Sequence, residues 1–309
     1  MAEKRSNKKN VNALITLLED PDKEVFEHVF QELTSIGNDV IPKLESEWEE
    51  SQNPLLQGRI ENLIHNIQFQ GLKEEFEKWA NVDSSNLLYG AYLVSRYIYP
   101  ELNFGDIRSK IDIIKQDIWL EINEYLTALE RVKVFNHIIY SIHRFYGDSE
   151  TFNQPKSSFI GNLLSNKKGN SIALGILYLA IAKELDIPIY GVNLPHHFIL
   201  AYVDADKQNL LLFDEEHQEK VLFYINPFNE GAIFTEKEIG IYLEKLNIQK
   251  DPITDEFAPN YFEPIGHEKV IEVLLSQLIA SYQSRGQKNK MEELEELLNI
   301  LKQTNSKTE

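Results

Sequence analysis

The sequence predicts an α+β protein in which a central buried helix packs on an antiparallel sheet, with helical extensions at both ends. Segment 172–185 is apolar on nearly every side, as expected of a helix inside a core. The segments after Pro188 are short, rich in β-branched and aromatic residues, and separated by turn residues, which is typical of strands. The segments before and after this region have apolar residues at helical spacing.

Residues 1–80 are predicted to form a short helical array. A helix at 11–18 stops at an Asp-Pro-Asp turn, a second ends at Gly37, and an Ile-Pro-x-Leu segment opens a third. A further helical pair is expected at 55–67 and 72–79. The order of turns resembles a HEAT repeat. Because such units cannot bury their apolar faces alone, we expect the array to stack on the next domain.

The second predicted domain, 81–265, begins with helices between residues 86 and 144 and continues into the core. After the buried helix, turn residues separate the expected strands, which are 189–194, 198–203, 210–213 and 221–225. The third part, 266–309, is predicted to form two helices, one on each side of Gly286, and a tail. It resembles a tetratricopeptide-type hairpin.

The charge of the chain argues against polyanionic partners. Its 31 basic and 49 acidic residues give a net charge of −18. A field of that sign repels phosphate backbones and anionic lipids, and the only basic cluster is at residues 4–9. We therefore expect neither nucleic-acid nor membrane binding. Because no apolar run reaches the length of a membrane span, we expect a cytoplasmic protein.

The chain has no cysteine, so disulfides, thiolate metal sites and thiol nucleophiles are all excluded. Two histidines, His137 and His143, lie near opposite sides of one expected helix and do not form a metal pair. The acidic residues Asp204, Asp206 and 214–216 lack the spacing of a calcium loop. We expect no metal and no cofactor.

Five short blocks, in order, are similar to the SirB-type transglutaminase-like family. Two form the core of the resemblance: GNSIALGILYL at 169–179 and LDIPIYGVNLPHHF at 185–198. The others are FYGD at 145–148, PKSSF at 155–159 and INPFNEG at 225–231. The resemblance covers roughly residues 86–234 and implies the fold first, because a shared fold does not transfer an activity.

The resemblance also implies a site. The superfamily has a Cys in a Gly-x-Cys context at the start of the central helix, a His opening the next strand, and an Asp on a later strand. These positions match Ser171, His197 and Asn226, so two of the three expected identities have changed. The Pro-Gly-His-Phe of relatives has become Pro-His-His-Phe, with His196 in place of the Gly.

Each of these residues also has a structural interpretation. Ser171 precedes an apolar run and is a preferred helix N-cap residue. His197 could be a half-buried residue that hydrogen-bonds its neighbours, and Asn226 before a proline is an ordinary turn residue. His196 should alternate with His197 along the strand and face the other side.

Three functions remain open. The first is a degenerate, non-catalytic module that binds a protein or peptide through the former substrate cleft or through the helical repeats. The second is a serine-dependent amide hydrolase or acyltransferase, with Ser171 as nucleophile, His197 as base and Asn226 orienting the imidazole. The third is a regulatory role without small-molecule chemistry. The sequence does not determine the oligomeric state.

Overall fold

The structure is a computed structural model that describes residues 11–204 and 221–305. The chain divides into two compact units, Met1–Phe76 and Glu77–Glu309, which are described separately. The basic cluster, the expected strand 210–213 and the acidic residues Asp206 and 214–216 lie outside the described residues. The predicted α+β class is confirmed.

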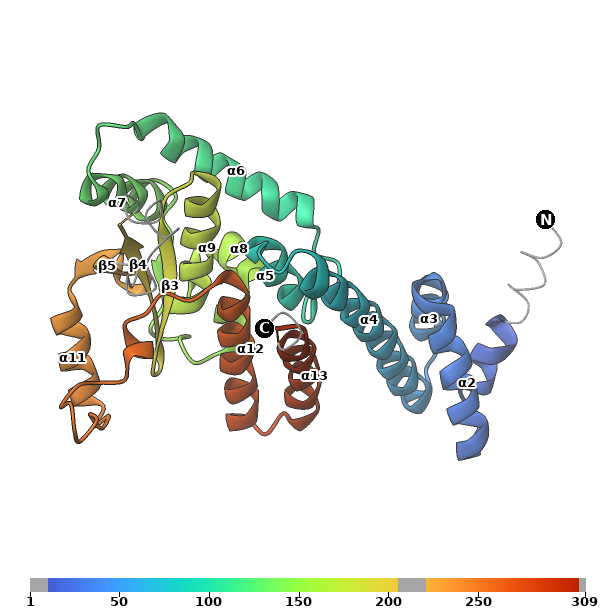
Figure 1. Cartoon of the computed structure of the whole chain (residues 1–309). Coiled ribbons are helices and arrows are strands. Elements are labelled where there is room, and N and C mark those ends of the chain that lie inside the picture. The colour runs from blue at the N-terminus through green and yellow to red at the C-terminus, as the bar shows by residue number, and fades with distance from the viewer. Residues whose placement is uncertain (1–10, 205–220, 306–309) are drawn as a thin grey trace. The chain divides into compact units, whose positions relative to one another are not determined.

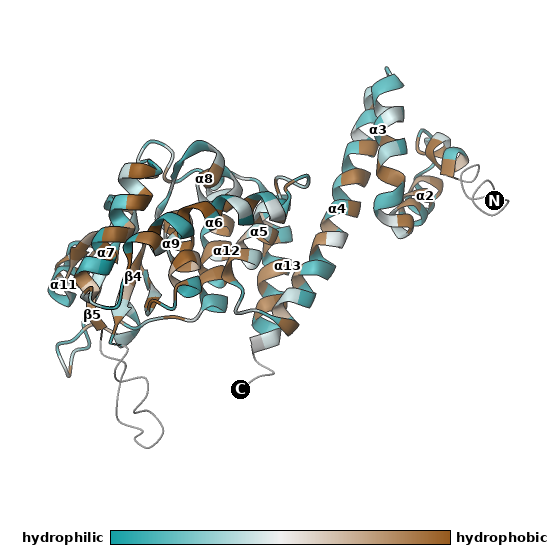
Figure 2. Ribbon diagram, turned by 90° about the horizontal axis from the view of Figure 1, so that it is seen from above, coloured by the Kyte–Doolittle hydropathy of each residue, from teal (hydrophilic) through white to brown (hydrophobic). Residues whose placement is uncertain are grey.

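The first unit is entirely helical where it is described. Asp22 caps its second helix by accepting from the Glu24 amide, and Gly37 ends that helix with a φ of 75°. After a helix at 11–17, the elements are α2 (Lys23–Ile36), η1 (Gly37–Val40), α3 (Ile41–Glu50) and the first part of α4 (Pro54–Val82). In Figure 2, apolar and polar residues alternate along these helices, as expected of amphipathic segments.

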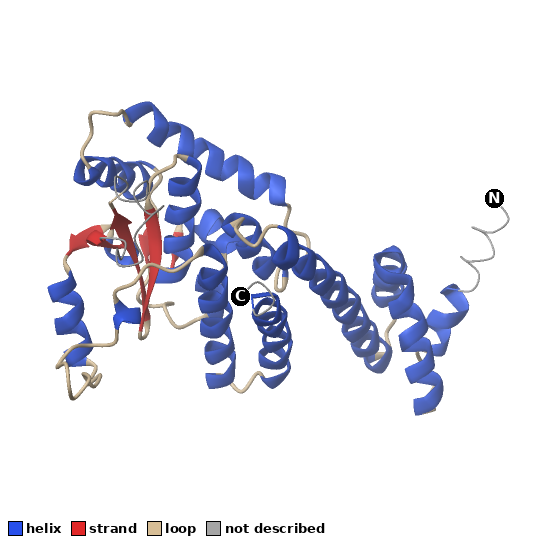
Figure 3. Ribbon diagram, in the orientation of Figure 1, coloured by secondary structure: helices blue, strands red, loops and turns tan. Residues whose placement is uncertain are grey.

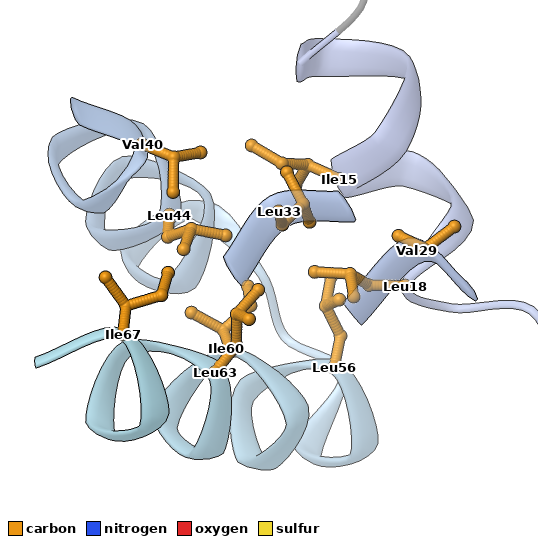
Figure 4. Close-up of a cluster of buried hydrophobic side chains, with 10 residues drawn as sticks. All are labelled: Ile15, Leu18, Val29, Leu33, Val40, Leu44, Leu56, Ile60, Leu63 and Ile67. Atoms are coloured by element: carbon orange, nitrogen blue, oxygen red, sulfur yellow. The ribbon is translucent and has the colours of Figure 1, made fainter. Parts of the chain in front are cut away.

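The core of this unit is formed by aliphatic side chains from all four helices (Figure 4). They recur three or four residues apart, so that each helix contributes one stripe to the core. The buried residues are Ile15, Leu18, Val29, Leu33, Val40, Leu44, Leu56, Ile60, Leu63 and Ile67.

The expected break between 67 and 72 is wrong, because α4 is one helix of 29 residues. Gly71 lies between the two expected helices. A single glycine inside a helix costs only about 1 kcal/mol relative to alanine. Buried apolar residues on both sides, Ile67 and Leu72 among them, hold the helix together through that position.

Helices lead into the core of the second unit. Before the buried helix come α5 (Leu87–Arg96), α6 (Phe104–Glu121), α7 (Ala128–Asn136), the π-helical turn η2 (His137–Ile142), β1 (Tyr146–Gly147), η3 (Pro155–Ser158), α8 (Ile160–Asn166) and β2 (Lys168–Gly169). The two short strands pair in parallel and bring the 146–148 segment next to the start of the buried helix.

The central helix is α9 (Ser171–Glu184), and its first twelve residues are all buried. It packs against β4 and β3 of the sheet. Gly175 permits this contact, because a Cβ there would lie 2.6 Å from the ring of Phe198. The predicted buried helix on an antiparallel sheet is therefore confirmed (Figure 1).

The sheet has the order β3-β4-β5-β6 and is antiparallel throughout (Figure 3). Its strands are β3 (Ile189–Leu194), β4 (His197–Val203), β5 (Val221–Asn226) and β6 (Ala232–Phe234). After η4 (Pro227–Asn229) and β6, the chain continues through α11 (Glu236–Lys245), η5 (Pro259–Tyr261), α12 (His267–Ser284) and α13 (Lys288–Asn305). Strand β6 was not expected from the sequence.

Candidate functional site

The start of α9 is held by Asn170, not by Ser171. The Asn170 side chain accepts from the Ala173 amide at 3.1 Å and donates to Ser158 Oγ at 2.7 Å. The N-cap interpretation of Ser171 is therefore wrong by one residue. Asparagine caps a helix at least as well as serine. Asn170 directly precedes Ser171, so the helix begins one residue after the cap, at Ser171.

Ser171 instead serves the neighbouring strand. Its Oγ accepts from the Phe198 amide at 3.2 Å, and the residue is only 1% exposed. The last β4–β5 pair is Leu200 with Ile225, because the chain turns away into η4 at Pro227. Phe198 lies beyond that pair, so its buried amide lacks a strand partner and the serine hydroxyl supplies the acceptor.

His197, the residue before Phe198, contacts Asn226. Its Nε2 lies 3.2 Å from Asn226 Oδ1. That oxygen also accepts from the amides of Phe228 at 3.1 Å and Asn229 at 3.2 Å, so it is the carbonyl end of the side chain. Since the oxygen can only accept, Nε2 carries the hydrogen in this arrangement and the neutral ring has its lone pair on Nδ1.

Burial lowers the pKa of His197 below the ordinary value of a histidine, and the hydrogen bond with Asn226 opposes this only in part. The rings of Phe228 and Tyr242 flank the imidazole, each with its centroid 6.3 Å away. The imidazole is therefore held neutral near pH 7 in a largely aromatic environment.

The loop that carries Asn226 is fixed by three polar side chains, of which Tyr140 and Tyr178 are buried and Asn136 is half-buried. Tyr140 Oη donates to the Pro227 carbonyl at 2.9 Å, and Asn136 Nδ2 donates to the Gly231 carbonyl at 2.8 Å. Tyr178 on α9 donates to Asn136 Oδ1 at 3.2 Å. No local signal in the sequence distinguishes Asn136, because charged and polar residues also occur elsewhere in this helical stretch.

A cleft of about 960 Å³ opens beside these residues. Asn170, directly before Ser171, and His196, directly before His197, both line it. Other walls come from β3 at Asn193 and from α12 at Lys269 and Glu272. Ser171, His197 and Asn226 are not among the described residues that line this cleft.

His196 lies in the two-residue turn between β3 and β4, not on the strand. It has a φ of 60° and is exposed, whereas His197 is half-buried. The expectation that the two histidines alternate along one strand is wrong, because β4 begins at His197. The turn is Pro195-His196, in which the second residue needs a positive φ that glycine adopts most easily.

Ser171, His197 and Asn226 lie in one region of the structure, but Ser171 is linked to the other two only through the residue next to His197. The His197 ring touches Asn226, and Ser171 touches the residue after His197. No hydrogen bond joins Ser171 Oγ to a ring nitrogen of His197, two residues that the structure describes.

The described residues contain neither a metal-binding cluster nor a membrane-spanning helix. Within 11–204 and 221–305, no cluster of three or more His, Asp or Glu side chains could hold a metal ion. Among the helices described there, none is long and apolar enough to cross a membrane.

A family model of the transglutaminase-like superfamily matches residues 105–276, which is more than half of the chain. The chain belongs to the transglutaminase-like superfamily. The matched region contains the central helix, the whole sheet and the first half of α12, including Lys269 and Glu272 of the cleft wall. The fold implied by the sequence resemblance is therefore confirmed at the level of the superfamily.

Similar superfamily relatives include bacterial and mammalian proteins. The chain is 22% identical over 189 residues to the UPF0162 protein of Vibrio cholerae, covering 61% of this chain and 63% of that protein. It is 24% identical over 205 residues to the UPF0162 protein of Xylella fastidiosa, covering 66% of this chain and 68% of that protein. It is 24% identical over 182 residues to F-box only protein 21 of Mus musculus, covering 50% of this chain and 27% of that protein.

The chain thus spans about a quarter of the mammalian relative and about two thirds of the bacterial ones. No solved structure matches the chain.

Proposed function

We propose that this chain is a transglutaminase-like module without covalent chemistry, which binds a protein or peptide in the cleft beside the former nucleophile position. The observation that carries the proposal is the environment of Ser171. The hydroxyl is buried, and one of its lone pairs is taken up by the Phe198 amide. Ser171 therefore completes the backbone hydrogen bonding of β4, which requires no reaction.

The chemistry of the site agrees with this proposal. A thiol in this position ionises near neutral pH, whereas a serine hydroxyl needs a well-placed base, usually supported by a carboxylate. The chain has no cysteine. Asn226 is uncharged and cannot stabilise an imidazolium, and burial already holds His197 in its neutral form.

The finer assignments belong to the same proposal. The blocks at 169–179 and 185–198 support a place within the SirB-type branch of the superfamily. We propose the division into 1–80, 81–265 and 266–309, with HEAT-like helices in the first part and a tetratricopeptide-like hairpin in the last. These flanks could contribute further binding surface, and the protein would act in the cytoplasm. A regulatory role without small-molecule chemistry is a separate, third alternative.

A serine-dependent amide hydrolase is the second candidate. The pairing of His197 Nε2 with Asn226 favours it, because that pairing leaves Nδ1 with its lone pair, as a general base requires. Ser171 also lies at the N-terminus of α9, where backbone amides and the helix dipole favour an oxyanion.

Labelling with a fluorophosphonate separates the two candidates. The folded protein and its Ser171→Ala variant are incubated with the reagent, and the intact mass of each is measured by mass spectrometry. The binding proposal predicts no adduct on Ser171. An adduct on the wild-type protein that is missing from Ser171→Ala would establish the hydrolase and refute the non-catalytic proposal.

A further inference from the structure

We infer that the cleft takes an acidic peptide segment in extended conformation, which pairs with the outer edge of β3 at Asn193. This inference rests on the proposed function and names the ligand class and its binding mode. Three features of the described residues support it: a free stretch of strand edge, the charge of the cleft, and the strained conformation of His196.

The first feature is the direction of the β3 main chain. Along an antiparallel strand, successive residues bond alternately to one side and to the other. The Pro188 carbonyl accepts from Val203 of β4, so residues 188, 190, 192 and 194 face β4. The Gly191 carbonyl accepts from the Ile265 amide on the opposite side. Gly191 and Asn193 therefore face outward.

The outer edge is occupied at Gly191 and open at Asn193. Ile265 forms an isolated antiparallel bridge with Gly191, after the chain has passed through η5. Within 11–204 and 221–305, no residue bonds to the Asn193 main chain from the outer side. Asn193 is exposed and lines the cleft, with α12 beside β3 (Figure 1). An extended peptide could therefore pair with this edge where the bridge to Ile265 ends.

The second feature is the charge of the cleft. Its described lining includes Lys269, Lys302 and His196 but a single carboxylate, Glu272. Glu272 lies 3.2 Å from Lys269 in an ion pair. The cleft is thus slightly positive in a chain of net charge −18. Since distant charges are screened beyond about 8 Å at physiological salt, the local lining decides which ligand charge is favoured.

The third feature is the conformation of His196. A non-glycine residue with a φ of 60° is strained, and such strain is concentrated at functional sites. Tyr242 Oη donates to the Pro195 carbonyl at 2.7 Å and holds the turn in place. The turn thereby presents an exposed imidazole to the cleft close to Asn193, where a peptide carboxylate could accept from it.

The test uses the full chain and three labelled peptides with the same apolar residues at alternate positions. The intervening positions carry Glu, Gln or Lys. Affinity is measured by fluorescence anisotropy at low and at physiological salt. We expect the Glu peptide to bind about two- to fivefold more tightly than the Gln peptide, and the Lys peptide to bind least.

Two pairs of variants test strand pairing at Asn193 and charge recognition by Lys302. Asn193→Pro removes the main-chain N–H that faces outward, and an edge strand tolerates proline at such a position. Asn193→Ala keeps that N–H. Any loss that the two variants share belongs to the side chain, so we expect binding to Asn193→Pro to be about fivefold weaker than binding to Asn193→Ala. Lys302→Gln should weaken the Glu peptide, whereas Lys288→Gln makes the same charge change on a side chain that pairs with Glu292 and is absent from the cleft lining.

N-methylation of single peptide bonds in the Glu peptide gives a second readout on the unaltered protein, in case Asn193→Pro fails to fold. Loss of affinity at one or two specific amides supports strand pairing. Binding that is indifferent to peptide charge, to N-methylation and to Asn193→Pro would overturn the inference and leave the proposed function standing. No binding of any of the three peptides would also overturn the inference, whereas the proposed function is overturned by a Ser171-dependent adduct in the fluorophosphonate experiment.

Discussion

Ser171 has a structural role at the scale of one residue. Its hydroxyl accepts from a Phe198 amide that the sheet leaves unpaired. Removing the acceptor leaves a buried donor unsatisfied, so Ser171→Ala should lower the free energy of unfolding by about 1–3 kcal/mol. Denaturant unfolding measures this change. A neutral substitution would mean that the hydroxyl is not needed for the fold.

His196 is the residue for which stability and function should oppose each other. Glycine adopts a positive φ without strain, so His196→Gly should raise the free energy of unfolding by about 0.5–1 kcal/mol. The same change should weaken the Glu peptide, because the imidazole is lost from the cleft. Thermal unfolding and anisotropy on one sample test both effects. Tighter binding with higher stability would remove the functional reason for the strained histidine.

The buried imidazole of His197 makes stability depend on pH. Its folded pKa lies below its unfolded value of about 6.5, so the unfolded state binds the proton first on acidification. The stability that His197 contributes is complete above pH 6.5 and is lost as pH falls from there through the folded pKa. His267 has a lowered pKa for the same main reason and acts in the same direction.

An NMR titration of the ring should give a His197 midpoint below 6.5, and His197→Gln should flatten the fall in stability between pH 7 and pH 5. Glutamine keeps a donor for Asn226 but does not titrate in this range. A midpoint at or above 6.5 would show that the ring is better solvated, or better paired, than its burial indicates.

At the scale of elements, the loop after β5 depends on a close fit. Gly231 has a φ of 70°, and a Cβ there would lie 1.9 Å from Asn136 Oδ1. Gly286 has a φ of 68° with nothing within 4 Å. Both substitutions to alanine incur the cost of the left-handed conformation, about 1–2 kcal/mol, but only Gly231→Ala also displaces Asn136.

We therefore expect Gly231→Ala to be the more destabilising by at least about 1 kcal/mol. It should also perturb the His197 ring signals, which Gly286→Ala should leave unchanged. Equal losses for the two variants would show that Asn136 does not hold the loop tightly.

The elements also show what the sequence could and could not predict. The buried helix and strands β3, β4 and β5 follow from local composition, and they were predicted. The expected break between 67 and 72 was wrong, because α4 continues through Gly71 and is buried on both sides of it. The polar contacts of Asn136, Tyr140 and Tyr178 were not predicted, because each joins residues more than forty positions apart. The π-helical η2 and the three-residue strand β6, which pairs with the nearby β5, were also not predicted.

At the candidate site, the contacts between side chains could not be predicted from the sequence. The family pattern identified Ser171, His197 and Asn226, but a pattern does not show which atoms meet. That Ser171 bonds to the Phe198 amide follows from where β5 ends, which local sequence does not reveal. The role of Asn193 depends on the register of β3, which is a property of the folded sheet.

At the scale of the whole molecule, the two compact units have separate cores. Every described residue of the cleft belongs to Glu77–Glu309. Leu44→Ala, in the core of the first unit, should lower the stability of that unit by about 2–5 kcal/mol and leave peptide affinity unchanged. Thermal unfolding and anisotropy check this, and weaker peptide binding would show that the first unit contributes to the ligand site.

The central claim is recognition without covalent chemistry. The most direct test is to incubate the wild-type protein with the Glu peptide at saturating concentration and to measure the masses of both by mass spectrometry. The account predicts a reversible complex in which both masses are unchanged. Cleavage of the peptide, or its attachment to the protein, that disappears in Ser171→Ala would contradict it.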